Sequence, residues 1–123
     1  MSDLIAEYHG VPVLVCAADG PPIASAQDAL DHLVGAAFDH AEVIAVPAER
    51  LDDTFFDLST GVAGEILQKL VNYRFRLVVV GDISLHLAAS SSLPDLVREA
   101  NRGRQIWFVP DLNALADRLK RPE

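Results

Sequence analysis

Two hydroxyl residues and a glycine stand where the sequence predicts the start of a helix. Ser59, Thr60 and Gly61 follow Asp57 and come directly before a helical pattern of apolar residues. Side-chain oxygens and free backbone N–H groups at such a start can bind an anion or accept a phosphoryl group. The alternative is that Ser59 or Thr60 only caps the helix, since nearly every helix needs such a residue. The candidate binding surface consists of Asp57, Ser59, Thr60, Gly61 and Gly64.

Four arginines form a second candidate site, an anion patch. Arg74 and Arg76 lead into an expected strand at 76–81, while Arg102 and Arg104 lead into another at 105–109. If these strands are neighbours, the four guanidinium groups gather at their amino-terminal edge and can bind a carboxylate or phosphate. The alternative is solvated charge near helix C-termini, where cations complement the helix dipole.

Three aspartates follow expected strands, at the edge where ligands gather in open parallel sheets. Asp57, Asp82 and Asp111 could together hold Mg²⁺ through carboxylate oxygens, but each also has an ordinary role as a cap or turn former. The four histidines lack the spacing of a zinc site, and no hydrolase, Walker A or dinucleotide motif occurs. We therefore expect no metal, no cofactor and no catalytic activity.

Composition excludes several classes of partner. The net charge of −8, from 10 Lys and Arg against 18 Asp and Glu, disfavours nucleic acid and anionic membranes. The single cysteine, Cys16, lies in an apolar run, so we expect its side chain to be buried. A lone cysteine cannot form an internal disulfide, which fits a protein of the reducing cytoplasm. The start of the chain lacks the pattern of a signal peptide, and no apolar run approaches the ~20 residues that span a bilayer. Half of the residues are hydrophobic, which leaves room for a partner surface or a homodimer contact.

Hydrophobic patterning places the elements. Leu4 to Tyr8 and Val11 to Ala17 form a hairpin around His9-Gly10, although Pro12 indicates an edge or a bulge in the second strand. Further strands are expected at 42–47, 76–81 and 105–109, and helices at 26–37, from 62 to 71, from 92 to 102 and after 111. Residues 51–58 are expected to form a loop. The Ser90-Ser91-Ser92 tract is expected to form a loop that ends in an N-cap.

This order of elements predicts the fold class. A hairpin followed by alternating strands and helices is typical of an α/β fold in which a mixed sheet with right-handed parallel crossovers is covered by about four helices. The whole chain, 1–123, is expected to be a single domain.

Across nearly its whole length the sequence resembles a small bacterial family known as domain of unknown function 4180. The resemblance is carried by five stretches, Phe55-Phe56-Asp57-Leu58-Ser59-Thr60-Gly61, Gly64-Glu65-Ile66-Leu67-Gln68-Lys69, Val71-Asn72-Tyr73, Val80-Gly81-Asp82 and Ala100-Asn101-Arg102-Gly103. It implies no particular activity.

A more distant resemblance, from Glu42 to Leu119, is to the STAS domain of anti-sigma-factor antagonists and sulfate transporters. It matches Asp57 to the aspartate of the family's Asp-Ser-Ser/Thr-Gly loop, and it matches Thr60 to the hydroxyl that such antagonists have phosphorylated. Leu58 is an extra residue within that loop. The resemblance implies a STAS-like mixed sheet and makes Thr60 a candidate phosphorylation site.

Together these observations predict a cytoplasmic, non-catalytic STAS-like module that regulates another protein by binding it around Asp57 to Gly64. The small side chains at that helix start would let a partner backbone approach closely. The alternative is a receptor for a small molecule or an anion, which would use the same helix start or a pocket beneath residues 51–58. A metal-dependent enzyme is the remaining alternative.

Overall fold

The computed structural model describes residues 3–120, and its sheet begins with the predicted hairpin. Strand β1 (Leu4–Tyr8) pairs antiparallel with β2 (Val11–Val15). His9 and Gly10 between them have φ values of 52° and 84°, the left-handed conformation that two-residue hairpins favour. Strand β2 ends two residues earlier than the apolar run predicts.

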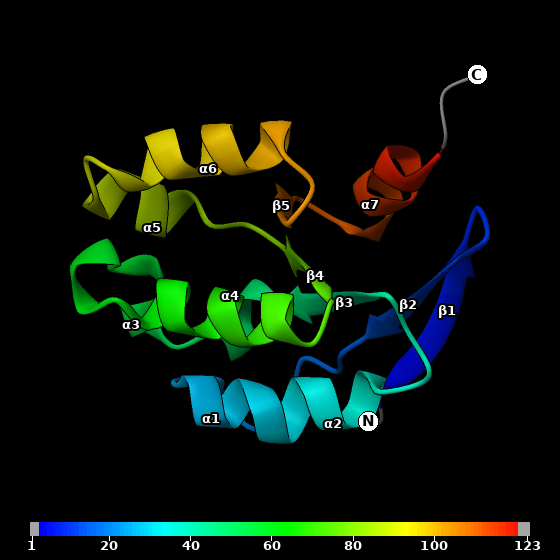
Figure 1. Ribbon diagram of the computed structural model, residues 1–123. Coiled ribbons are helices and arrows are strands. Elements are labelled where there is room, and N and C mark those ends of the chain that lie inside the picture. The colour runs from blue at the N-terminus through cyan, green and yellow to red at the C-terminus, as the bar shows by residue number, and fades with distance from the viewer. Residues whose placement is uncertain (1–2, 121–123) are drawn as a thin grey trace.

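Three further strands extend the sheet in chain order. Strands β3 (Val43–Pro47), β4 (Arg76–Val80) and β5 (Ile106–Val109) run parallel to β2, so the order among the described residues is β1-β2-β3-β4-β5. The mixed α/β sheet expected from the sequence is therefore confirmed (Figure 1). Strand β2 pairs with β3 only through Val13 to Val15. Pro12 lies before these residues and pairs only with β1, so the part of β2 that contains the proline lies at an edge on the β3 side, as expected.

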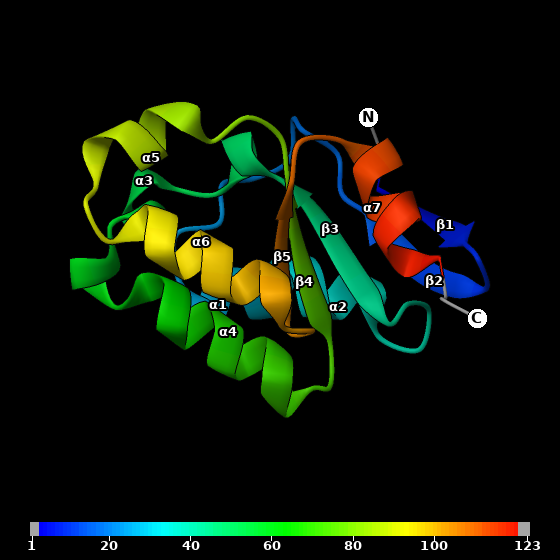
Figure 2. The ribbon, with the colours of Figure 1, turned by 90° about the horizontal axis from the view of Figure 1, so that it is seen from above.

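Two helical layers cover the sheet unequally. The first face packs against α1 (Ala26–Ala29), α4 (Val62–Asn72) and α6 (Leu93–Arg102), and the second against α7 (Leu112–Leu119) (Figures 1 and 2). Because strand side chains alternate, Ile44 and Val46 belong to the larger core and Val43 and Ala45 to the smaller one. Both faces of β3 are buried, as its continuous apolar run indicates.

The first helix begins with a capping box, which Ser25 followed three residues later by Asp28 predicts. The Ser25 hydroxyl accepts a hydrogen bond from the backbone N–H of Asp28 at 3.1 Å, and the Asp28 carboxylate accepts one from the N–H of Ala24 at 2.9 Å. The helix continues from α1 through a π-helical turn, η1 (Leu30–Val34), into α2 (Gly35–Ala37).

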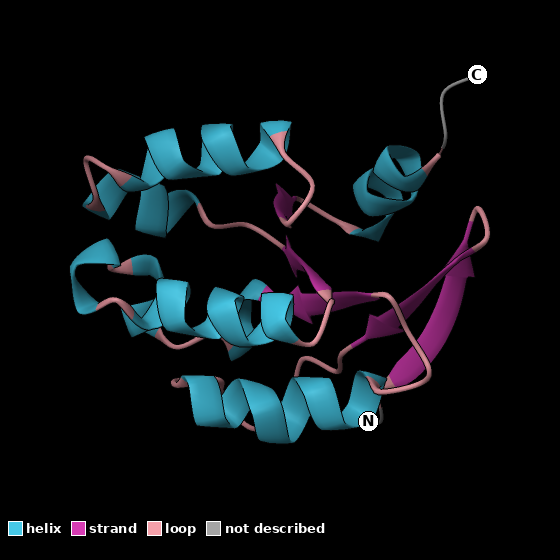
Figure 3. Ribbon diagram, viewed as in Figure 1, coloured by secondary structure: helices cyan, strands magenta, loops and turns pink. Residues whose placement is uncertain are grey.

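Several short helices lie where the sequence predicts a loop or no element (Figure 3). A 3₁₀ turn η2 (Ala48–Arg50), helix α3 (Asp53–Phe56) and a second 3₁₀ turn η3 (Leu58–Thr60) separate β3 from α4, and α5 (Ser84–Ala89) follows β4. Elements of one or two turns are too short to show a hydrophobic period, which is why they escape prediction.

The last two helices begin near their predicted residues. Ser92 occupies the N-cap position of α6, but the hydroxyl that accepts from the N–H of Leu93 belongs to Ser90, at 3.1 Å. Asp111 caps α7 as expected, accepting from the N–H of Ala114 at 2.8 Å. Among residues 3–120, each helix falls short of the length and apolarity needed to cross a membrane.

Candidate functional site

The predicted helix start is exposed, but its hydroxyls are engaged within their own turn. The Asp57 carboxylate accepts from the backbone N–H of Ser59 at 3.1 Å and from its hydroxyl at 2.7 Å. The Thr60 hydroxyl lies 2.7 Å from the carbonyl oxygen of Thr54 and 2.8 Å from that of Asp57, and it accepts from the N–H of Val62 at 3.2 Å. These contacts close the turn between α3 and α4.

The N-cap of α4 is Gly61, not Ser59 or Thr60. Gly61 has a φ of 78°, so the chain enters the helix through a left-handed residue. Gly64 lies on the exposed surface, and a Cβ added to it would meet no atom within 4 Å. Asp57, Ser59, Thr60, Gly61 and Gly64 are all exposed. The segment follows α3 and includes η3, so the chain does not pass directly from a strand into α4.

Only two of the four predicted arginines meet at the amino-terminal edge of the sheet. The Nε of Arg76 donates to the carbonyl oxygen of Arg104 at 2.7 Å, because β4 and β5 are neighbours. The guanidinium of Arg102 instead pairs with Glu99 at 3.3 Å, and Arg74 lies in the turn after α4 with a φ of 66°. Neither Arg74 nor Arg102 lines the basic hollow at this edge.

The basic hollow contains two cations that the sequence analysis missed. Arg118 and Lys120 join Arg76 and Arg104 around Trp107. The guanidinium carbons of Arg76 and Arg118 lie 4.4 and 4.2 Å from the centre of the Trp107 ring. Both arginines contact the indole closely enough for a cation–π interaction. The spacing of apolar residues within α7 predicts the helix, but it could not predict that Arg118 lies over a residue of β5.

The three aspartates considered as metal ligands do not converge. Asp57, Asp82 and Asp111 line three different hollows, and no group of three or more His, Cys, Asp or Glu within residues 3–120 could hold a metal ion. Asp82 caps a turn instead. Its carboxylate accepts from the backbone N–H of Ser84 at 2.9 Å, and this bond holds the pKa of Asp82 below its ordinary value.

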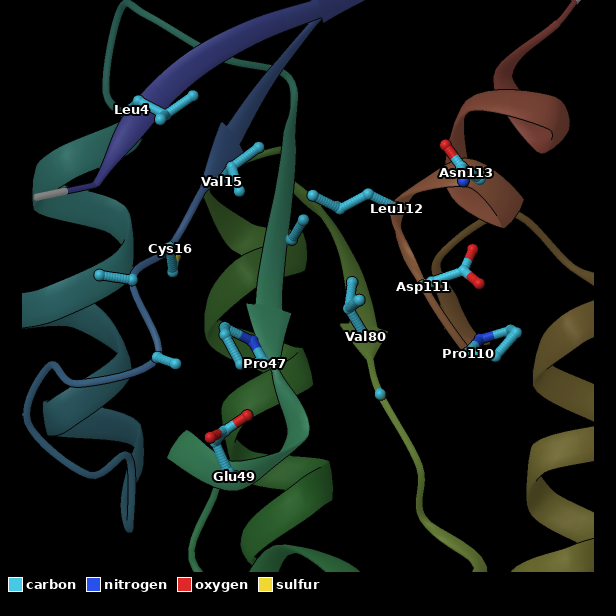
Figure 4. Close-up of a pocket in the computed structure, with 14 residues that line it drawn as sticks. Leu4, Val15, Cys16, Pro47, Glu49, Val80, Pro110, Asp111, Leu112 and Asn113 are labelled. Carbon is cyan, nitrogen blue, oxygen red and sulfur yellow. The ribbon is translucent and has the colours of Figure 1, made fainter. Parts of the chain in front are cut away.

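A mainly apolar cavity lies on the second face, at the carboxyl ends of the parallel strands (Figure 4). It has a volume of about 530 Å³. Its apolar walls come from β1, β2, β3, β4 and the first turn of α7, namely Leu4, Val15, Ala45, Pro47, Val80 and Leu112. Of the strand ends expected to gather ligands, those at Pro47, Gly81 and Pro110-Asp111 all reach this one cavity.

The cavity exists because α7 covers only part of the second face. Leu115 and Leu119 of α7 belong to the core of the second face, and Leu119 lies beside Val11 and Trp107 near the starts of their strands. Toward the strand ends, the small side chain of Ala45 leaves space that the first turn of α7 does not fill.

A buried arginine, also missed from the sequence, anchors one wall of this cavity. The Arg50 side chain is only 2% exposed, and its guanidinium donates to the carbonyl oxygens of Ala17 at 3.2 Å and of Pro21 at 2.9 and 3.1 Å. It also lies 3.9 Å from the Asp3 carboxylate. Gly20 permits this approach, because a Cβ there would lie 2.5 Å from the Arg50 Cζ. Arg50 thus holds the loop that carries Ala17 and Ala18.

Cys16 lies beside the same wall and is buried, as predicted. Burial, reinforced by the negative charge of Asp3, raises the pKa of its thiol to about 12. The thiol is therefore protonated at neutral pH, when it is a poor nucleophile.

Comparison with known proteins shows the family. The model of the family described as Domain of unknown function (DUF4180) matches residues 8–119. The chain belongs to this family. No curated protein and no solved structure matches it. The predicted family is thus confirmed, whereas the resemblance to STAS domains is not.

The stretches that carry the DUF4180 resemblance fall in different places. Val80 and Gly81 reach the apolar cavity, while Phe55 to Gly61 forms α3 and the turn before α4. Asn101 joins α6 to β5, since its side-chain oxygen accepts from the N–H of Phe108 at 2.8 Å and its amide nitrogen donates to the same residue's carbonyl oxygen at 3.3 Å. These stretches therefore contribute to both the cavity and the frame around it.

Proposed function

We propose that this DUF4180 protein is a non-catalytic receptor domain that binds a small, largely apolar molecule in the cavity at the carboxyl ends of its strands. One observation carries the proposal: an apolar cavity of about 530 Å³ opens at this edge of the sheet. Pockets for small ligands typically measure about 300–1,000 Å³ and are lined by apolar side chains. In open α/β sheets they occur at the carboxyl ends of the strands.

The polar groups of the cavity support binding rather than catalysis. Its lining contains the carboxylates of Glu49 and Asp111, the amide of Asn113 and the protonated thiol of Cys16. Asp111 is engaged in capping α7. A nucleophile with an adjacent general base, the arrangement used in covalent catalysis, is missing from this described lining.

A single substitution that fills the cavity tests this proposal. Val80 is partly exposed and points into the cavity (Figure 4), so Val80→Phe occupies the space with little disturbance of the core. The matched control is Val71→Phe, at a residue of α4 that is 43% exposed. We expect the parent and Val71→Phe to bind the neutral fluorescent dye Nile red at one saturable site, and Val80→Phe to bind it at least about ten-fold more weakly.

Circular dichroism verifies that both variants are folded. Absence of saturable dye binding to the parent would contradict the proposal. So would equal binding by folded Val80→Phe.

A second candidate function is regulation through a protein partner bound at Asp57 to Gly64. Beyond the exposed glycines, it is favoured by Leu85 of α5, which is 84% exposed and lines a hollow together with Asp57 and Phe56. Phosphorylation of Thr60 would add nearly two negative charges beside Asp57, and it would remove the hydrogen bond that the hydroxyl donates within the turn. Both effects would alter the surface offered to a partner.

Capture experiments with Thr60→Glu, Thr60→Ala and Leu85→Asp test this second function. We expect the parent to retain a specific protein that Leu85→Asp loses, and we expect Thr60→Glu and Thr60→Ala to differ in the amount retained. Light scattering on the purified chain would detect a second copy as the partner. Identical recovery by all four proteins, with a monomeric mass, would rule out this function.

A further inference from the structure

We infer that the cavity at the carboxyl ends of the strands selects a cationic ligand, one with an apolar body and an ammonium or amidinium head. The inference rests on the proposed receptor function and adds the charge of the ligand. Its basis is the distribution of charge around the cavity. Among the described lining residues, Glu49 and Asp111 are the charged ones, and neither Lys, Arg nor His contributes to the lining.

The two carboxylates approach the cavity from separate elements. Glu49 comes from η2, after β3, and Asp111 comes from the loop between β5 and α7, so the two residues line opposite sides of the cavity (Figure 4). The Asp111 carboxylate is directed toward the start of α7, which it caps, whereas Glu49 lies across the cavity beyond Pro47. A ligand whose body contacts Leu4, Val15 and Val80 therefore meets a carboxylate at either side of the cavity.

Both carboxylates retain acceptor capacity. Within residues 3–120, Glu49 makes no hydrogen bond or ion pair, and Asp111 uses only its Oδ1 atom, to accept from the N–H of Ala114. An ionised carboxylate has room for several donors, and bonds to a charged donor are the stronger ones. An ammonium group would supply those donors, whereas a carboxylate ligand would face two like charges.

The nearest buried cation does not reverse this preference. The Arg50 guanidinium is occupied by the carbonyl oxygens of Ala17 and Pro21 and by Asp3, and it does not line the cavity. The basic hollow around Trp107 includes Arg104, just before β5, whereas the cavity includes Pro110, just after it. The basic hollow and the cavity with its two carboxylates thus lie at opposite ends of β5, in a protein with a net charge of −8.

Binding of three probes with the same alkyl chain tests the inference. Octylamine, 1-octanol and octanoate differ in head-group charge, and each is titrated below its aggregation limit by calorimetry at pH 7 and low ionic strength. We expect octylamine to bind most tightly and octanoate most weakly, with a ratio of about ten between their dissociation constants. Because the carboxylates are exposed, 0.5 M NaCl should reduce this ratio several-fold.

Two isosteric variants test whether the two carboxylates cause the tighter binding of octylamine. Glu49→Gln removes one charge, and Asp111→Asn removes the other while keeping a residue that can cap α7. Each should weaken octylamine about three-fold and leave 1-octanol unchanged. Glu65→Gln, at an exposed residue of α4, makes the same change in net charge away from the cavity and should alter neither affinity.

The outcomes separate this inference from the function on which it rests. Equal binding of the three probes, tightest binding of octanoate, or an effect of Glu65→Gln as large as that of Glu49→Gln would overturn the charge preference while Nile red binding still supports the receptor. If none of the three probes binds and Nile red does not bind either, both the charge preference and the receptor function are overturned.

Discussion

At the scale of single residues, Arg50 links the packing of the domain to its cavity. A buried guanidinium is stabilising only when its donors are satisfied, and here two backbone carbonyl groups and the Asp3 carboxylate surround it. The residues it holds, Ala17 to Pro21, include part of the cavity wall.

Arg50→Met should therefore lower the free energy of unfolding by about 3 kcal/mol, because the substitution removes the buried donors that bond the partly buried carbonyl oxygens of Ala17 and Pro21. Urea denaturation measures the difference. The control is Arg98→Met, since Arg98 is paired with Asp95 on the surface of α6, and this change should cost less than about 0.5 kcal/mol. Equal stability of Arg50→Met and the parent would show that the buried contacts contribute nothing.

At the scale of elements, the start of α4 depends on a turn rather than on a serine or threonine N-cap. The Asp57 carboxylate accepts a hydrogen bond from the Ser59 hydroxyl, and the Asp57 carbonyl oxygen lies within hydrogen-bond distance of the Thr60 hydroxyl. Gly61, in the left-handed conformation, then leads the chain into the helix. Gly64, three residues later, is an ordinary helical residue with open space around it.

Two alanine substitutions should therefore have opposite effects on stability. Gly61→Ala places a Cβ at a φ of 78° and should destabilise the fold by about 1 kcal/mol. Gly64→Ala should stabilise it by about 0.5–1 kcal/mol, because alanine loses less backbone entropy in a helix. Thermal unfolding compares the two, and the same sign for both would contradict this account of the helix start.

At the scale of the whole molecule, unequal coverage of the sheet decides where a ligand can bind. Helices α1, α4 and α6 pack on the first face together with shorter elements, whereas α7 lies on the second face (Figure 2). On that second face a cavity remains at the carboxyl ends of the strands. The same arrangement brings Arg118 of α7 over Trp107 at the other end of the strands. One helix thus sets the position of both the apolar cavity and the basic hollow.

The sequence alone determined the elements whose side chains repeat over several turns or along a buried strand. The run of Arg76 to Val80, the helical pattern from Val62 and the caps at Ser25 and Asp111 all have their predicted roles, because each depends on residues close together in the chain. The resemblance of five stretches of the sequence to DUF4180 was likewise enough to predict the family.

Only the tertiary structure decided which of those elements meet. Arg50 is buried against a loop about thirty residues earlier, and Arg118 of α7 lies over Trp107, where it joins Arg76 and Arg104. The cavity depends on the lateral position of α7, which is set by side-chain volumes on several strands, including the small Ala45. A local periodicity specifies which face of a helix is apolar, but the place where that face docks depends on packing against residues distant in the sequence.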